Sequence, residues 1–142
     1  MIVDVEMGTL RTLTLDLGNI NSPTWSPRGD LLAITAERNV DEDFDIYTVR
    51  TDGSGLRRLT ELPGTDSHRS WSPDAEWSAF TSARGGFKDE AALHPFNPQP
   101  YGDLRDMCAG GSDVRMLEDN QFDDGTPAWI PQLAPVDDVG RD

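Results

Sequence analysis

An internal repeat constrains the fold of this 142-residue chain more than any other feature. Residues 22–38 and 68–84 both contain Trp-Ser-Pro, followed by a two-residue turn and an apolar run that ends near an arginine. A third start, Pro127-Ala128-Trp129, lies near the C-terminus. Repeats with a period of about 40–50 residues indicate supersecondary units that stack on one another. The chain is therefore expected to be an array of similar units.

The second half of each unit repeats as well. Residues 45–60 match residues 103–117, and residues 2–14 look like a further copy of the same half. Each unit reads as four short strands separated by turns that contain Pro or Gly. After a first strand that includes the tryptophan, the expected strands are residues 31–36, 45–50 and 56–60 in one unit and residues 77–82, 102–108 and 114–117 in the next. Four-stranded units at this period predict an all-β chain built of β-propeller blades.

The turn after Trp-Ser-Pro differs between the two units, being Arg28-Gly29 in the first and Asp74-Ala75 in the second. Glycine adopts a positive φ at little cost, and alanine does so less readily. We therefore expect Gly29 to suit its turn better than Ala75. The repeated tryptophans are predicted to pack between neighbouring blades, where each ring would bury about 200 Å². They are Trp25, Trp71 and Trp129.

Two linked motifs identify the repeat. Trp-Ser-Pro and its turn, at residues 25–29 and 71–74, precede Asp45-Ile46-Tyr47 and the turn Asp52-Gly53-Ser54-Gly55 in the first unit. The chain resembles the TolB-type (WD-like repeat) β-propeller family over nearly its whole length. The resemblance implies a fold shared with the gating propellers of prolyl-oligopeptidase-type peptidases and with oligogalacturonate lyases, but a fold does not fix a function.

The second unit departs from the family pattern at four positions. Ala75 replaces the turn glycine, and Arg69 stands where proline is usual. Arg105 and Asp106 occupy strand positions that are usually apolar.

The blade count predicts more than one chain per ring. Residues 21–60 form one expected blade, and residues 66–118 form another that carries an insertion at 85–101. Residues 1–17 would supply strands C and D of a shared blade, and residues 124–136 its first strand or strands. That makes about three blades, whereas closed propellers have about 4–8. Since TolB-type domains resemble six-bladed rings, two chains are expected to close one ring as a homodimer. The alternative is a piece of a longer protein.

The charge balance limits the partners of the chain. Acidic residues number 26 against 12 Lys and Arg, which gives a formal net charge of −14. Such a surface disfavours nucleic acid and anionic membranes, and it favours cations or basic protein surfaces. An acidic surface also suits a halophilic setting, where salt screens the self-repulsion. Solubility alone is the alternative explanation.

A candidate metal site follows from the repeat register. In propellers of this kind the turn before the first strand lies near the central channel, and Asp66, His68 and Asp124 occupy that turn. Carboxylates and an imidazole suit a divalent cation such as calcium or manganese. The three residues are therefore the candidate metal ligands, and weak candidates for catalysis, at one channel mouth. The alternative for His68 is an ordinary loop histidine beside a carboxylate.

The insertion at residues 85–101 is the most distinctive segment. It combines aromatic residues with three prolines, a composition typical of a preformed recognition loop. Long loops on a rigid scaffold often carry function. The candidate ligand-binding residues are Phe87, His94, Phe96 and Tyr101. The alternative is a surface loop that packs on itself or on a partner chain.

These features favour a binding scaffold for proteins or peptides, which resembles the TolB propeller, over an enzyme. The sequence has no Gly-x-Ser-x-Gly motif, and Ser112 lies in a turn with no histidine nearby along the chain. Two alternatives stay open: a metal-assisted hydrolase or lyase at the channel mouth, and a gating propeller from a prolyl-oligopeptidase-like enzyme. No signal peptide is visible. The resemblance implies the periplasm, whereas a chain complete as written would be cytoplasmic.

Overall fold

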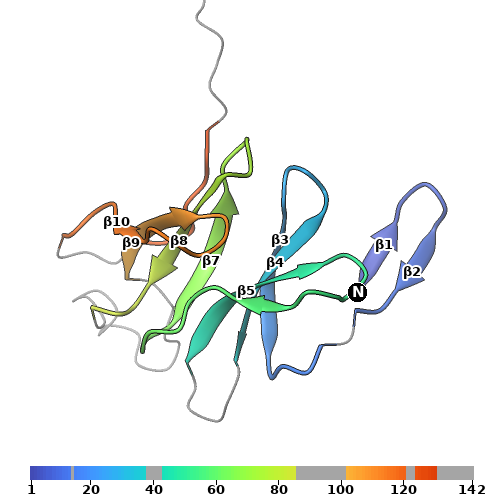
Figure 1. Ribbon diagram of the computed structural model, residues 1–142, viewed down its shortest axis with the longest axis horizontal. Coiled ribbons are helices and arrows are strands. Elements are labelled where there is room, and N and C mark those ends of the chain that lie inside the picture. The colour runs from blue at the N-terminus through green and yellow to red at the C-terminus, as the bar shows by residue number, and fades with distance from the viewer. Residues whose placement is uncertain (14, 38–42, 86–101, 121–123, 131–142) are drawn as a thin grey trace, which may run out of the picture.

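The computed structural model describes residues 1–13, 15–37, 43–85, 102–120 and 124–130. The regular elements of these residues are ten strands (Figure 1). They are β1 (Ile2–Asp4), β2 (Thr9–Arg11), β3 (Ile20–Trp25), β4 (Leu31–Glu37), β5 (Phe44–Arg50), β6 (Arg57–Arg58), β7 (Asp66–Trp71), β8 (Trp77–Ser82), β9 (Asp103–Cys108) and β10 (Arg115–Met116). Within these ranges, no helix has the length and apolarity to cross a membrane.

The strands form two four-stranded antiparallel sheets and one hairpin. One sheet has the order β3-β4-β5-β6 and the other the order β7-β8-β9-β10, so each sheet follows the chain. The hairpin pairs β1 with β2. Figure 1 shows the two sheets side by side, with the hairpin beyond the first sheet. Two consecutive meanders of four strands are the arrangement that the repeat predicts.

The predicted strand bounds hold best in the middle of each sheet. Strand β8 has the predicted bounds, and β4 and β5 each gain one residue. The outermost strands β6 and β10 are shorter than predicted, with two residues each. These strands pair on one side only, and their side chains are mostly exposed. Little burial is therefore available to extend them.

Both turns after Trp-Ser-Pro adopt a positive φ, which is 72° at Gly29 and 61° at Ala75. A Cβ on Gly29 would meet nothing within 4 Å. Replacing Gly29 by alanine is therefore expected to act through backbone strain alone, and to lower the free energy of unfolding by about 1 kcal/mol. Denaturant unfolding measures this change. Gly110→Ala is the control, because Gly110 has no positive φ and its Cβ would lie 3.8 Å from Arg57. An equal loss at Gly110 would contradict the explanation.

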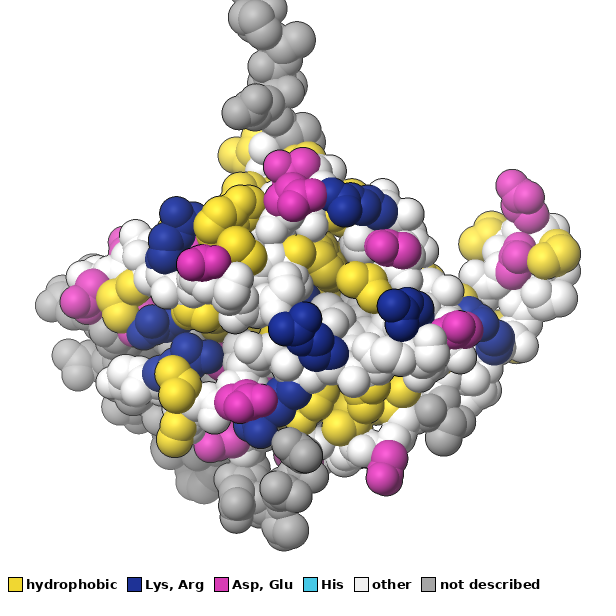
Figure 2. All heavy atoms as spheres, in the orientation of Figure 1, with side chains coloured by type: hydrophobic (Ala, Val, Ile, Leu, Met, Phe, Trp, Pro, Cys, Tyr) yellow, Lys and Arg dark blue, Asp and Glu magenta, His cyan; other side chains and the backbone are white. Residues whose placement is uncertain are grey.

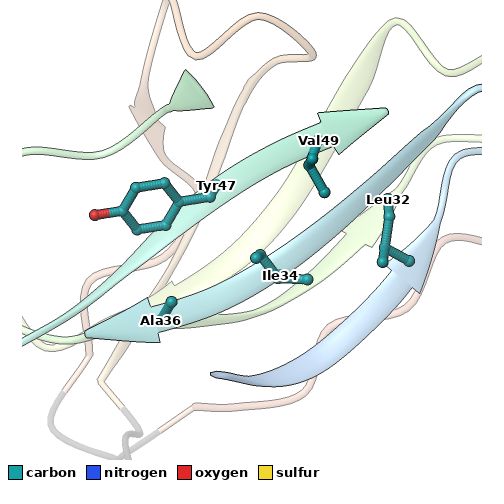
Figure 3. Close-up of a cluster of buried hydrophobic side chains, with 5 residues drawn as sticks. All are labelled: Leu32, Ile34, Ala36, Tyr47 and Val49. Carbon is teal, nitrogen blue, oxygen red and sulfur yellow. The ribbon is translucent and has the colours of Figure 1, made fainter. Parts of the chain in front are cut away.

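The first sheet has its own apolar cluster. Alternate residues of β4 and β5 bring five side chains to one face, as Figure 3 shows: Leu32, Ile34, Ala36, Tyr47 and Val49. Leu13, Leu15 and Leu17, which also alternate, pack against this cluster. The segment before β3 therefore covers one face of the first sheet.

A second cluster joins the two sheets. Ile46 and Leu59 come from the first repeat unit, and Phe80 and Met107 come from the second. Ala33 of β4 also packs with Trp71 and Ala75 of the second unit. The two sheets thus share a core, as neighbouring propeller blades do.

The three repeated tryptophans differ in burial. Trp71 is 7% exposed and packs on the first sheet, as predicted, but Trp25 is 49% and Trp129 37% exposed. Within one chain, the prediction of burial between blades therefore holds for Trp71 and not for Trp25 and Trp129. No described residues form a further blade in front of Trp25. Trp129 is tied to the second sheet by a hydrogen bond, which its Nε1 donates to the carbonyl of Ser70 at 3.0 Å.

Candidate functional site

A repeated bulge shapes the start of each unit. Ser22, His68 and Thr126 each lie three residues before a repeated tryptophan, and their φ angles are 47°, 50° and 50°. The strand register shifts here, between Asn21 and Thr24 in β3 and between Ser67 and Ser70 in β7. Bulges re-aim side chains and often lie near functional sites. Sequence reasoning missed this feature, although the three positions align in the repeat.

His68 occupies the bulge of β7 and is half-buried. Its Nδ1 lies 3.1 Å from the hydroxyl of Ser67. Burial lowers the pKa of His68 below its ordinary value. The imidazole is therefore neutral at pH 7, which is the form that can ligate a metal.

Asp66 begins the same strand and is fully buried. Its Oδ2 lies 2.5 Å from the Nη2 of Arg84, whose side chain is 11% exposed. Burial raises the pKa of Asp66, and the hydrogen bond and charge of Arg84 oppose that rise. The carboxylate is thus neutralised by an arginine beyond the end of β8.

A second buried ion pair lies on the neighbouring sheet. Asp45 of β5 accepts from Arg58 at 2.5 Å and from the hydroxyl of Thr60 at 3.2 Å. The Thr60 hydroxyl in turn accepts from the backbone N–H of Ile46 at 3.0 Å. Burial raises the pKa of Asp45, Arg58 opposes the rise, and the charge of Asp66 adds to it.

These two ion pairs and Thr60 form a junction network, which we define as Asp45, Arg58, Thr60, Asp66 and Arg84. The strands β5 and β7 that carry the two aspartates contact each other. The network therefore adds buried polar contacts to the apolar core shared by the sheets.

Asp124 lies at a different place. It forms an antiparallel bridge with Gly102, and its Oδ2 accepts from the side-chain amide of Asn120 at 2.9 Å. Asp66 pairs with Ser82, and Ser82 pairs with Asp103, the neighbour of Gly102. Asp66 and Asp124 are thus about three strand spacings apart, or about 14 Å.

The described part of the chain does not bring the three candidate metal ligands together. It holds no group of three or more His, Cys, Asp or Glu side chains that could bind a metal ion. Asp66 is paired with Arg84, and Asp124 lies across β8 and β9 from it. The metal site stays a prediction that this geometry does not favour.

The predicted ligand-binding residues Phe87, His94, Phe96 and Tyr101 lie outside the described residues. The structure places only the two ends of the insertion. Strands β8 and β9 pair as far as Ser82 and Asp103, so the insertion leaves and returns at one point. A Cβ on Gly102 would lie 2.1 Å from the carbonyl oxygen of Ser82. Only glycine fits this close approach, beside the strand end that carries Asp66.

The unusual aspartate of β9, Asp106, is accommodated by pairing with an arginine of β10. Asp106 accepts from Arg115 Nε at 2.9 Å and from its Nη2 at 2.5 Å. The guanidinium of Arg115 also lies 4.3 Å from the centre of the Trp77 ring. The second sheet therefore keeps the four-stranded order despite these departures from the apolar pattern.

Comparison with curated proteins finds matches of 63, 64 and 131 residues. No protein-family model matches the chain. The chain is 39% identical over 64 residues to Protein TolB homolog of Chlorobium luteolum, and the match covers 45% of this chain and 14% of that protein. It is 38% identical over 63 residues to the uncharacterized peptidase YuxL of Bacillus subtilis, and this match covers 44% of this chain and 9% of that protein. It is 28% identical over 131 residues to Atu1656, an uncharacterized protein of Agrobacterium fabrum, covering 92% and 38%.

Solved structures decide the fold. A protein assigned as TolB from Agrobacterium tumefaciens matches with a TM-score of 0.69 and 24% identity, covering 89% of this chain and 44% of that one. The chain has a TolB-type β-propeller fold. TolB from Acinetobacter baumannii matches with a TM-score of 0.61 and 24% identity, covering 84% of this chain and 26% of that one. The chain spans less than half the length of each of these five proteins.

The TolB-type resemblance predicted from the Trp-Ser-Pro repeat is thereby confirmed. In this TolB-type fold the bulge, the tryptophan and the following turn recur together in β3 and β7. The junction network lies where the two TolB-type sheets meet.

Proposed function

We propose that this chain is a scaffold that binds basic proteins or peptides, and that two copies close one six-bladed ring. The observation that carries the proposal is a pair of apolar ends on a TolB-type fold. At the N-terminal end, Val3 is 52% and Leu10 66% exposed, and at the C-terminal end Leu117 is 54% and Ile130 81% exposed. Figure 2 shows hydrophobic side chains on the hairpin, which stands away from the two sheets.

Ring closure would cover both ends at once. The hairpin β1–β2 of one copy would pair with residues 124–130 of the other, so each copy completes a blade of its partner. A two-fold arrangement supports such a reciprocal contact. It would also cover the free edge of the hairpin β1–β2, which otherwise invites pairing with other chains.

The net charge of the chain favours basic partners. At −14 the chain attracts basic surfaces, and the insertion at 85–101 offers a place for them. Phe87, His94, Phe96 and Tyr101 are the proposed contact residues. The insertion begins and ends beside the junction network, since Ser82 pairs with both Asp66 and Asp103.

Solution mass tests the ring. Light scattering behind size exclusion is expected to give about twice the 15.7 kDa of one chain. Leu10→Asp should return the mass to that of one chain, because it places a charge in the hairpin contact. Leu62→Asp is the matched control, since Leu62 is 58% exposed and lies outside both ends. A monomeric wild type would overturn ring closure and favour a segment that works within a longer protein.

Peptide selection tests the scaffold role. A random-peptide phage library selected on the purified protein should enrich sequences rich in lysine and arginine, and their binding should weaken as salt increases. A variant that combines Phe96→Ala and Tyr101→Ala should bind these peptides more weakly. Enrichment of no basic sequence would overturn the proposed partner class, whatever the oligomeric state.

A further inference from the structure

Arg69 is a buried cation at an unusual place in the repeat. It follows His68 in the bulge of β7, where the other two units have Pro23 and Pro127. Arg69 is 3% exposed, and its guanidinium carbon lies 3.8 Å from the centre of the Trp71 ring. Trp71 packs on Ala33 of the first sheet, so this stack lies near the contact between the sheets.

The hydrogen bonding of Arg69 is incomplete. Its Nη2 donates to the carbonyl of Ala109 at 3.2 Å. Its Nε and Nη1, and also the Nε1 of Trp71, are buried and have no hydrogen-bond partner. All three are donor atoms, and none of them has an acceptor among the described residues.

Arg69 also has no counter-charge. The ion pairs of the described residues use Arg28, Arg58, Arg84 and Arg115, and none of them involves Arg69. Burial lowers the pKa of Arg69 to about 9, so the side chain is still protonated at neutral pH. Burying a charge without a partner is strongly unfavourable, and buried charges in proteins are normally paired.

We propose that Arg69 and Trp71 form a binding site for a small monovalent anion at the junction of the two sheets. Three buried donors without acceptors, two of them on one cation, are complementary to an anion. The near-complete burial of both residues limits the ligand to the size of a halide or of a single carboxylate such as formate. The site is separate from the basic partners proposed above, and neither proposal depends on the other.

Thermal unfolding at constant ionic strength is the first test. The probes are the sodium salts of chloride, formate and gluconate, the last being too large for the site. Chloride or formate well above its Kd should raise the Tm by about 4 °C relative to gluconate, because an anion bound only to the folded state stabilises it. Above the Kd, the rise should grow in proportion to the logarithm of the anion concentration. A Tm that is the same in all three salts would overturn the proposal.

Variants separate the site from a general salt effect. Arg69→Met should abolish the difference between chloride and gluconate, and so should Arg69→Pro, which restores the residue of the other two units. Arg57→Met is the control, because it removes an exposed arginine and should keep the full difference. An anion effect that persists in Arg69→Met would overturn the proposal. If both Arg69 variants fail to fold, the chloride NMR line width of the wild type decides: broadening that formate reverses supports the site, and no broadening refutes it.

Discussion

Replacing Phe80 by alanine is expected to lower the free energy of unfolding by about 3–5 kcal/mol. Phe80 is fully buried, and it packs with Ile46 and Leu59 of the first unit and Met107 of its own. The substitution would therefore leave a cavity between the sheets. Domains of this kind have a total stability of about 5–15 kcal/mol. The variant should be close to unfolding at room temperature.

Guanidinium unfolding at a fixed protein concentration checks this expectation. Tryptophan fluorescence and far-UV circular dichroism should both report one transition, shifted by the same amount, because the Phe80 cluster belongs to both sheets. Leu62→Ala is the control, with an expected change of at most about 0.5 kcal/mol at an exposed site. Two transitions, of which only one moves, would show that the sheets unfold separately and would contradict the shared core.

The sequence predicts the fold well because the signals of a blade are local. A strand of alternating apolar residues, a proline that ends it and a tight turn all lie within a few residues of Trp25 or Trp71. Strand β8 accordingly has its predicted bounds. The positive φ of Gly29 is equally local. The length of β6 is not a local property, since an outer strand extends only as far as its neighbours bury it.

The candidate site depends on contacts that are distant along the chain. The pattern of Asp66 and His68 suggested metal ligands, because a carboxylate beside an imidazole suits a cation. The structure instead pairs Asp66 with Arg84, which no local rule selects. The burial of Trp71 and the exposure of Trp25 likewise depend on which neighbour each ring meets. The stack of Arg69 on Trp71 could be suspected only from an arginine at a proline position.

Breaking the Asp66–Arg84 pair is expected to have the second large effect. Arg84→Met should lower the free energy of unfolding at pH 7 by about 3–5 kcal/mol, because it leaves the charge of a fully buried carboxylate without a partner. Arg28→Met is the matched control. Arg28 pairs with Glu76 at the surface, where the two side chains are 57% and 61% exposed. Its loss should therefore cost less than about 1 kcal/mol.

The dependence of this cost on pH identifies the charge responsible. The ordinary pKa of Asp66 is 3.8, and burial raises it in the folded state. The folded protein therefore takes up this proton first as pH falls, so Asp66 favours folding at low pH. That contribution is lost as pH rises from 3.8 through the raised pKa. In Arg84→Met the opposing arginine is gone, so the pH range in which Asp66 favours folding extends to higher pH. The cost of Arg84→Met should thus be small near pH 4 and grow toward neutral pH.

Chemical denaturation of the wild type and of Arg84→Met across this pH range measures the effect. A variant that combines Asp66→Asn with Arg84→Met should lose the pH dependence, because no titrating carboxylate is left at the site. It should also be more stable at pH 7 than Arg84→Met alone, since an amide costs less to bury than an unpaired charge. A cost of Arg84→Met that stays constant with pH would show that lost packing, and not the Asp66 charge, causes the destabilisation. The junction network would then act as a filler of space between the sheets and not as an electrostatic link.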